Sequence, residues 1–203
     1  MTSTVSTSGS PLKLAQIRSR AWLTAPVLLG GYGLIRLVPG SKHPGPGWTS
    51  GHTALLASLL VFGLLLHGLY RLAGANDRAA LGPVLAARLG FGAALVGLAA
   101  SLAQVAIDLY TGLRAADSAD QSRMFAQIQS HPGVLPVVYQ IGPLFFYLGL
   151  LALLTVLAVR RRVPVWSPLL VLVGTVAMAA SLDLMTVGAV AYALALAPLR
   201  RAL

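Results

Sequence analysis

The chain contains no cysteine and no glutamate, and only five of its 203 residues are acidic. The absence of cysteine excludes disulfides, thiolate metal sites and thiol nucleophiles. Cysteine usage therefore gives no information on whether the protein lies in an oxidising or a reducing compartment. Charged residues make up 10% of the chain, whereas they make up about 25% of a typical soluble domain. Since so few charges cannot cover a water-facing surface, the composition excludes an ordinary soluble protein.

Hydrophobic residues, by contrast, make up 57% of the sequence, and its mean hydropathy is +0.79. About 20 apolar residues in a helix cross the hydrocarbon core of a bilayer. Five apolar stretches stand out, separated by prolines, glycines or charges: 21–38, 53–72, 88–113, 134–159 and 165–199. We therefore predict an all-α integral membrane helical bundle of five transmembrane helices, or six if the long last stretch holds a second, short span.

The first twenty residues are rich in Ser and Thr and then basic, with no apolar region before Ala21. This pattern is not that of a cleaved signal peptide. We expect residues 1–20 to form a disordered cytoplasmic tail and residues 21–203 to form a single transmembrane helical domain. The bilayer is the expected partner. A net charge of +10 from scattered Arg and Lys, without a basic cluster interleaved with aromatics, favours lipid headgroups over nucleic acid.

Lys and Arg residues also predict the orientation in the membrane, because short cytoplasmic loops carry an excess of them. With the N-terminus inside and five spans, nine basic residues fall on the inner segments and six on the outer ones. The prediction is a multi-pass protein of the cell membrane with a cytoplasmic N-terminus. A sixth span would bring Arg200 and Arg201 inside and strengthen this bias.

Two of the five acidic residues, Asp108 and Asp183, lie inside apolar stretches. An ionisable residue at membrane depth is costly unless it is paired, protonated or hydrated, so it indicates a functional site. Ser101, Gln104, Asp108 and Thr111 are spaced by three, four and three residues. On an α-helix that spacing places all four on one face.

The fourth stretch carries a second polar stripe of Pro136, Gln140, Pro143 and Tyr147. By the predicted topology, these residues meet Asp108 in the outer half of the bilayer. Apolar walls with a few convergent polar groups are typical of a small-molecule site. The predicted catalytic residues are Asp108 and Asp183, and the predicted binding residues are Arg36, His52, Gln104, Tyr139, Gln140 and Tyr147, with no metal and no cofactor. Alternatively, Arg36 neutralises one aspartate and the polar groups only fix the packing.

A short motif, Ser50-Gly-His52, follows Lys42 and precedes Ser122-Arg123 and His131. In order it resembles the signature of lipid-phosphate phosphatases, and this resemblance implies a phosphate site with His131 as the nucleophile. The chain departs from that family because seven residues separate Arg123 from His131 and no aspartate follows.

The Arg-rich, multi-span chain with its His-Pro-Gly-Pro-Gly-Trp segment resembles small multipass proteins of actinobacteria. A narrower resemblance, in size, span layout and two membrane carboxylates, is to the integral-membrane terpene cyclases of meroterpenoid pathways. It implies that Asp108 and Asp183 protonate a prenyl substrate, and burial favours the neutral acid that this step needs. The chain has fewer predicted spans than that family and no glutamate.

The competing class is a non-enzymatic membrane component that acts in transport, immunity or assembly. Small residues in the third and fifth stretches, among them Gly90, Gly92 and Gly97 of the third, permit close approach between helices. In the competing class these faces are the contacts of a homo-oligomer, and the aspartates are structural partners of Arg36.

Overall fold

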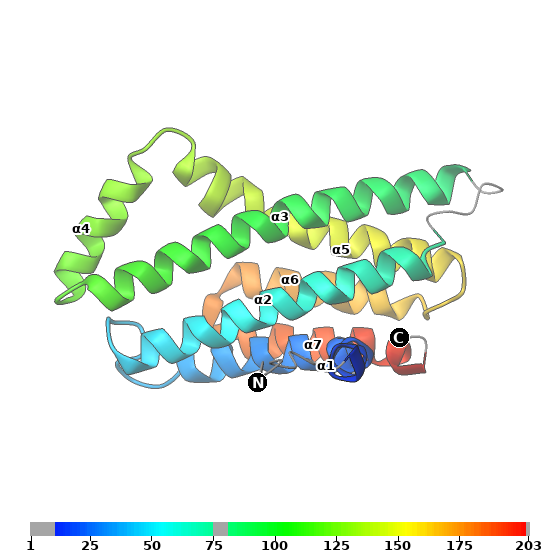
Figure 1. Cartoon of the computed structure of the whole chain (residues 1–203), viewed down its shortest axis with the longest axis horizontal. Coiled ribbons are helices and arrows are strands. Elements are labelled where there is room, and N and C mark those ends of the chain that lie inside the picture. Colours follow the sequence, from blue (N-terminus) through cyan, green and yellow to red (C-terminus); the bar gives the residue numbers. More distant parts are fainter. Residues whose placement is uncertain (1–10, 75–80, 202–203) are drawn as a thin grey trace, which may run out of the picture.

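The computed structural model describes residues 11–74 and 81–201, and these residues are helical with no strand (Figure 1). The predicted all-α fold class is confirmed. Long helices run side by side along the longest axis of the molecule, and α4 stands off at one end. In chain order the elements are α1 (Pro11–Arg36), α2 (Pro46–Leu72), α3 (Leu81–Arg114), α4 (Ser118–Gln129), the π-helix η1 (Val134–Ile141), α5 (Gly142–Val159), α6 (Trp166–Ala180), the 3-10 helix η2 (Leu182–Leu184), α7 (Met185–Leu196) and η3 (Ala197–Arg201).

Four helical segments are long and apolar enough to cross a membrane, which makes this a multi-pass membrane protein: Pro46–Leu72, Leu81–Arg114, Val134–Val159 and Leu182–Arg200. The first predicted stretch forms most of α1, which is not among the four. Its apolar part, from Ala21 to Arg36, extends only about 24 Å at ~1.5 Å per residue. Helix α1 begins at Pro11, inside the predicted tail, so residues 11–20 are helical. The rest of that tail, residues 1–10, lies outside the described residues.

The last apolar stretch is two helices and not one. Ser181 has an extended backbone (φ −157°, ψ 133°) and ends α6, and its hydroxyl accepts a hydrogen bond from the Asp183 amide at 3.2 Å. The chain then turns through η2 and returns as α7, which packs along α6 with Gly174 against Gly188. The alternative of a sixth, short helix therefore describes this region, and the C-terminal end of the chain returns to the end of the bundle where α6 began.

The helices close into a ring in which each packs on the next: α1 on α2, α2 on α3, α3 on α5, α5 on α6, α6 on α7, and α7 back on α1. The α3–α5 pair packs most extensively. The α5–α6 pair packs least, and α5 has no backbone contact with α7 among the described residues. The ring is therefore tight on one side and loose along the seam between α5 and the α6–α7 pair.

Glycines set the close α3–α5 approach. A Cβ at Gly97 would collide with the backbone of Phe145 and Phe146, and a Cβ at Gly149 would collide with the backbone of Ala94. Gly92, on another face of α3, has nothing within 4 Å of such a Cβ. Helices pack in this way in bilayers because small residues let their backbones approach. Gly97 is thus used inside the chain, and it is not available as an oligomer contact.

The stretch 115–132, which separates two of the predicted spans, contains the helix α4. Asp117 caps it by accepting a hydrogen bond from the Asp120 amide at 2.8 Å. Asp120 accepts a bond from the Ala116 amide at 3.0 Å and from Arg123 at 3.1 Å, and these bonds hold the pKa of its carboxyl below the usual range. The spacing of Asp117 and Asp120 is that of a capping box, so the sequence carried a signal for this helix.

Candidate functional site

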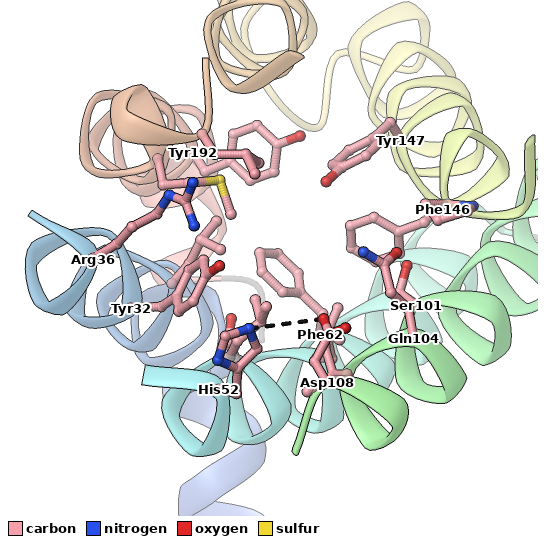
Figure 2. Close-up of a pocket in the computed structure, with 18 of the residues that line it drawn as sticks. Tyr32, Arg36, His52, Phe62, Ser101, Gln104, Asp108, Phe146, Tyr147 and Tyr192 are labelled. Carbon is pink, nitrogen blue, oxygen red and sulfur yellow. Dashed lines mark ion pairs between the residues drawn. The ribbon is translucent and has the colours of Figure 1, made fainter. Parts of the chain in front are cut away.

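A partly enclosed cavity of about 220 Å³ lies inside the ring of helices, nearer the end where α1 meets α2. Figure 2 shows side chains from α1, α2, α3, α5 and α7 converging on it. Its walls are mainly apolar, and the polar side chains lie at separate positions on them. The lining residues are Leu29, Tyr32, Arg36, Trp48, His52, Leu55, Ser58, Leu59, Phe62, Ser101, Gln104, Val105, Asp108, Pro143, Phe146, Tyr147, Leu182, Met185 and Tyr192.

Asp108 and His52 form a pair on the cavity wall, marked by the dashed line in Figure 2. Nε2 of His52 lies 3.7 Å from Oδ2 of Asp108, and both side chains are almost fully buried. The other ring nitrogen, Nδ1, lies 2.8 Å from the carbonyl oxygen of Trp48. Because Nδ1 must carry a proton to bond a carbonyl, Nε2 faces Asp108 with either a lone pair or a second proton. A proton on Asp108 makes it an acid beside a neutral imidazole, and the same proton on Nε2 makes the two groups an ion pair.

Trp48 fixes this pair in position. Its indole stacks on the His52 ring with centroids 4.1 Å apart, and its Nε1 donates a hydrogen bond to the Asp108 carbonyl oxygen at 2.7 Å. The indole occupies the space above Gly112, where a Cβ would collide with it. Because Gly112 on α3 has no side chain, the Trp48 ring from α2 can pack there and hold His52 and Asp108 in place.

Tyr139 approaches Asp108 from the π-helix η1. Its hydroxyl donates to Oδ1 of Asp108 at 3.4 Å, although Tyr139 does not itself line the cavity. Gln140, predicted to bind ligand, is exposed and lies outside the lining set. In η1 the Gly142 amide bonds the Val137 carbonyl, five residues back, so the α-helical spacing that predicted the stripe is broken here. Pro143 and Tyr147 follow the break and do line the cavity.

Three polar side chains face the cavity without a hydrogen-bonding partner among the described residues. Ser101 and Gln104 lie on α3, and Tyr147 lies opposite on α5 with its hydroxyl directed inward (Figure 2). Polar groups inside a membrane protein are costly when they are left unbonded. A ligand with polar atoms, or water, satisfies them when the cavity is filled.

Asp183 lies elsewhere, in η2 at the end of the bundle, and does not line the cavity. Its carboxylate accepts hydrogen bonds from Lys42 at 2.8 and 2.9 Å and from Nε of Arg36 at 3.2 Å. The side chain is 46% exposed. The sequence predicted a carboxylate at membrane depth, whereas the turn between α6 and α7 places Asp183 at the end of the bundle beside Lys42. Asp183 thus joins α1 and the α1–α2 loop to the α6–α7 turn.

The residues of the phosphatase-like motif do not come together. Arg123 is 79% exposed and pairs with Asp120, and His131 turns back to the Gln127 carbonyl oxygen. His52 faces the cavity beside Asp108. These positions leave no shared phosphate pocket for the three basic residues.

Several lining residues were missing from the predicted site, among them Trp48, Phe62, Met185 and Tyr192. Trp48, Phe62 and Met185 are apolar and carry no polar spacing signal. Tyr192 is fully buried, and its hydroxyl is 2.7 Å from Oγ1 of Thr175. Tyr192 was missed because the α6–α7 turn brings it to the cavity, and the sequence analysis favoured one helix there.

In the part of the chain that the structure describes, no group of three His, Asp or Glu side chains could hold a metal ion. No known family model, no curated protein sequence and no solved structure matches this chain. The geometry of the cavity alone therefore supports the functional proposal.

Proposed function

We propose that this membrane protein binds a prenyl or other lipid-like molecule in its central cavity and protonates it from the Asp108–His52 pair. The observation that carries the proposal is the position of this pair on the wall of an apolar cavity. The site differs from the one inferred from the sequence because Asp183, Tyr139 and Gln140 do not line the cavity, and a single buried carboxylate is left as the acid. Asp183 has a structural role in this proposal.

The specific reaction is a proton-initiated cyclisation. The Asp108 proton adds to a terminal alkene carbon, the alkene π electrons form the new C–H bond, and a tertiary carbocation is left. The next double bond attacks this cation and closes a ring. Loss of a proton to the Asp108–His52 pair then forms the product alkene and restores the acid. Proton and electrons balance without any co-reactant.

The lining of the cavity supports this chemistry. The rings of Phe62, Phe146 and Tyr192 are fully or almost fully buried and line the same cavity as Asp108. Aromatic faces attract a cation through their quadrupole, and an apolar cavity limits the water that would quench it. The Trp48 carbonyl holds His52 with Nε2 toward Asp108, so the proton can return along the same path.

The test is turnover of farnesylated phenols by membranes that contain the wild-type protein or Asp108→Asn. General acid catalysis contributes about 10²–10⁴-fold, so we expect Asp108→Asn to lose at least that much while still binding substrate. Asp120→Asn, which changes a partly exposed carboxylate on α4 outside the cavity lining, is the matched control and keeps full activity. Equal turnover in the wild type and Asp108→Asn contradicts the proposed acid. Binding without any turnover in the wild type favours the non-enzymatic class.

A further inference from the structure

The charges around Arg36 are unbalanced. Arg36 and Lys42 share the single carboxylate of Asp183. In the proposed function the Asp108–His52 pair holds one proton, so the pair carries no net charge. Among the described residues Arg36 has no second carboxylate within ion-pair distance. One positive charge therefore remains at this end of the cavity.

The geometry places that charge on Arg36. Lys42 contacts both oxygens of Asp183 at 2.8 and 2.9 Å, and its side chain is 45% exposed to the surroundings. Arg36 uses only Nε for Asp183, at 3.2 Å, and its side chain is 21% exposed. Arg36 also lines the cavity, with its guanidinium directed toward it in Figure 2. Its two terminal nitrogens form no hydrogen bond with a carboxylate in the described structure.

We infer that the ligand of this cavity is a monoanionic amphiphile, with a carboxylate bound by the terminal nitrogens of Arg36 and an apolar chain among Leu55, Leu59 and Phe62. This rests on the proposed function and names the substrate class of the same site. A guanidinium binds a carboxylate through two parallel hydrogen bonds. The terminal nitrogens of Arg36, whose side chain also hydrogen-bonds Tyr32, are not bonded to Asp183. A phosphate monoester carries about −1.5 to −2 charges and exceeds the single uncompensated charge.

Lys42 and Asp183, which do not line the cavity, give opposite predictions when each is replaced. Lys42→Gln leaves Asp183 to neutralise Arg36 alone, so affinity for an acid falls. Asp183→Asn removes the shared carboxylate, so affinity for an acid rises. General damage to the fold lowers affinity for acid and neutral ligands alike, and it cannot raise either.

The experiment compares geranic acid, geraniol and geranyl phosphate by their effect on Trp48 fluorescence in purified Trp22→Phe, Trp166→Phe protein. We expect this starting protein, in which Arg36 is unchanged, to bind geranic acid about ten-fold or more tightly than geraniol. This preference disappears in Arg36→Gln and Lys42→Gln and grows in Asp183→Asn, while geraniol affinity stays constant.

Equal affinity for geranic acid and geraniol in the starting protein overturns this inference and leaves the proposed apolar site intact. Tighter binding of geranyl phosphate than of geranic acid overturns the monoanion assignment. If none of the three binds, the proposed function and this inference both fail. A fall in acid affinity in Asp183→Asn, with geraniol unchanged, also contradicts the charge argument.

Discussion

Gly97 lies where α3 crosses the start of α5, against the backbone of Phe145 and Phe146, and Phe146 lines the cavity. A single added methyl group there must displace backbone, and overpacking of that kind costs about 1–3 kcal/mol. We predict that Gly97→Ala lowers the thermal unfolding temperature in detergent and weakens ligand binding. Gly92→Ala is the control on the same helix, because its Cβ meets open space, and we expect a change of about 1 kcal/mol or less. Equal effects of the two variants would argue against the α3–α5 packing.

Single residues were predictable from the sequence where they lie on a regular helix. The spacing of Ser101, Gln104 and Asp108 placed them on one face of α3, and all three line the cavity. His52, Arg36 and Tyr147 also line it as expected. Asp183 was misplaced, because burial inferred from an apolar run does not account for a turn within that run. Its partner Lys42 is 141 residues away in the chain, and no local pattern reveals such a contact.

At the level of the helices, two departures from regular α-structure explain most of the differences. The π-helix η1 changes the spacing between Gln140 and Tyr147, so only the part after Gly142 keeps the predicted face. Ser181 divides the last apolar stretch into α6 and α7. Hydropathy reports the length of an apolar segment and not where its backbone changes hydrogen-bonding pattern. The existence of the helices was therefore predictable, whereas the π-helix and the α6–α7 turn were not.

At the level of the whole molecule, the α6–α7 turn strengthens the proposed orientation. The α6–α7 turn returns the C-terminal end to the end of the bundle where α6 begins. Ten of the basic residues in the described ranges lie toward this end. Four lie toward the other: Arg36, Lys42, Arg114 and Arg123. Since cytoplasmic loops carry the excess of Lys and Arg, we propose that the ten-residue end is cytoplasmic. The cavity then lies toward the outer leaflet.

This orientation predicts which sites an impermeant maleimide reaches in intact cells. The chain has no native cysteine, so Gln127→Cys on α4 and Gly82→Cys at the start of α3 each provide a unique, exposed thiol. We expect labelling of Gln127→Cys in intact cells and of Gly82→Cys only after lysis. The reverse pattern would place the cavity in the inner half of the membrane.

The central claim is that an apolar molecule occupies the cavity beside Asp108, and contact quenching at Trp48 tests it most directly. Trp48 lines the cavity, whereas Trp166 is 44% exposed on the outside of the bundle. Two proteins are titrated with a brominated prenyl alcohol, one with Trp48 and the other with Trp166 as its single tryptophan. Bromine quenches indole fluorescence on contact. We predict saturable quenching of Trp48 that unbrominated geraniol reverses, and only gradual, unsaturable quenching of Trp166. Unsaturable quenching of the same size at both tryptophans would contradict the claim.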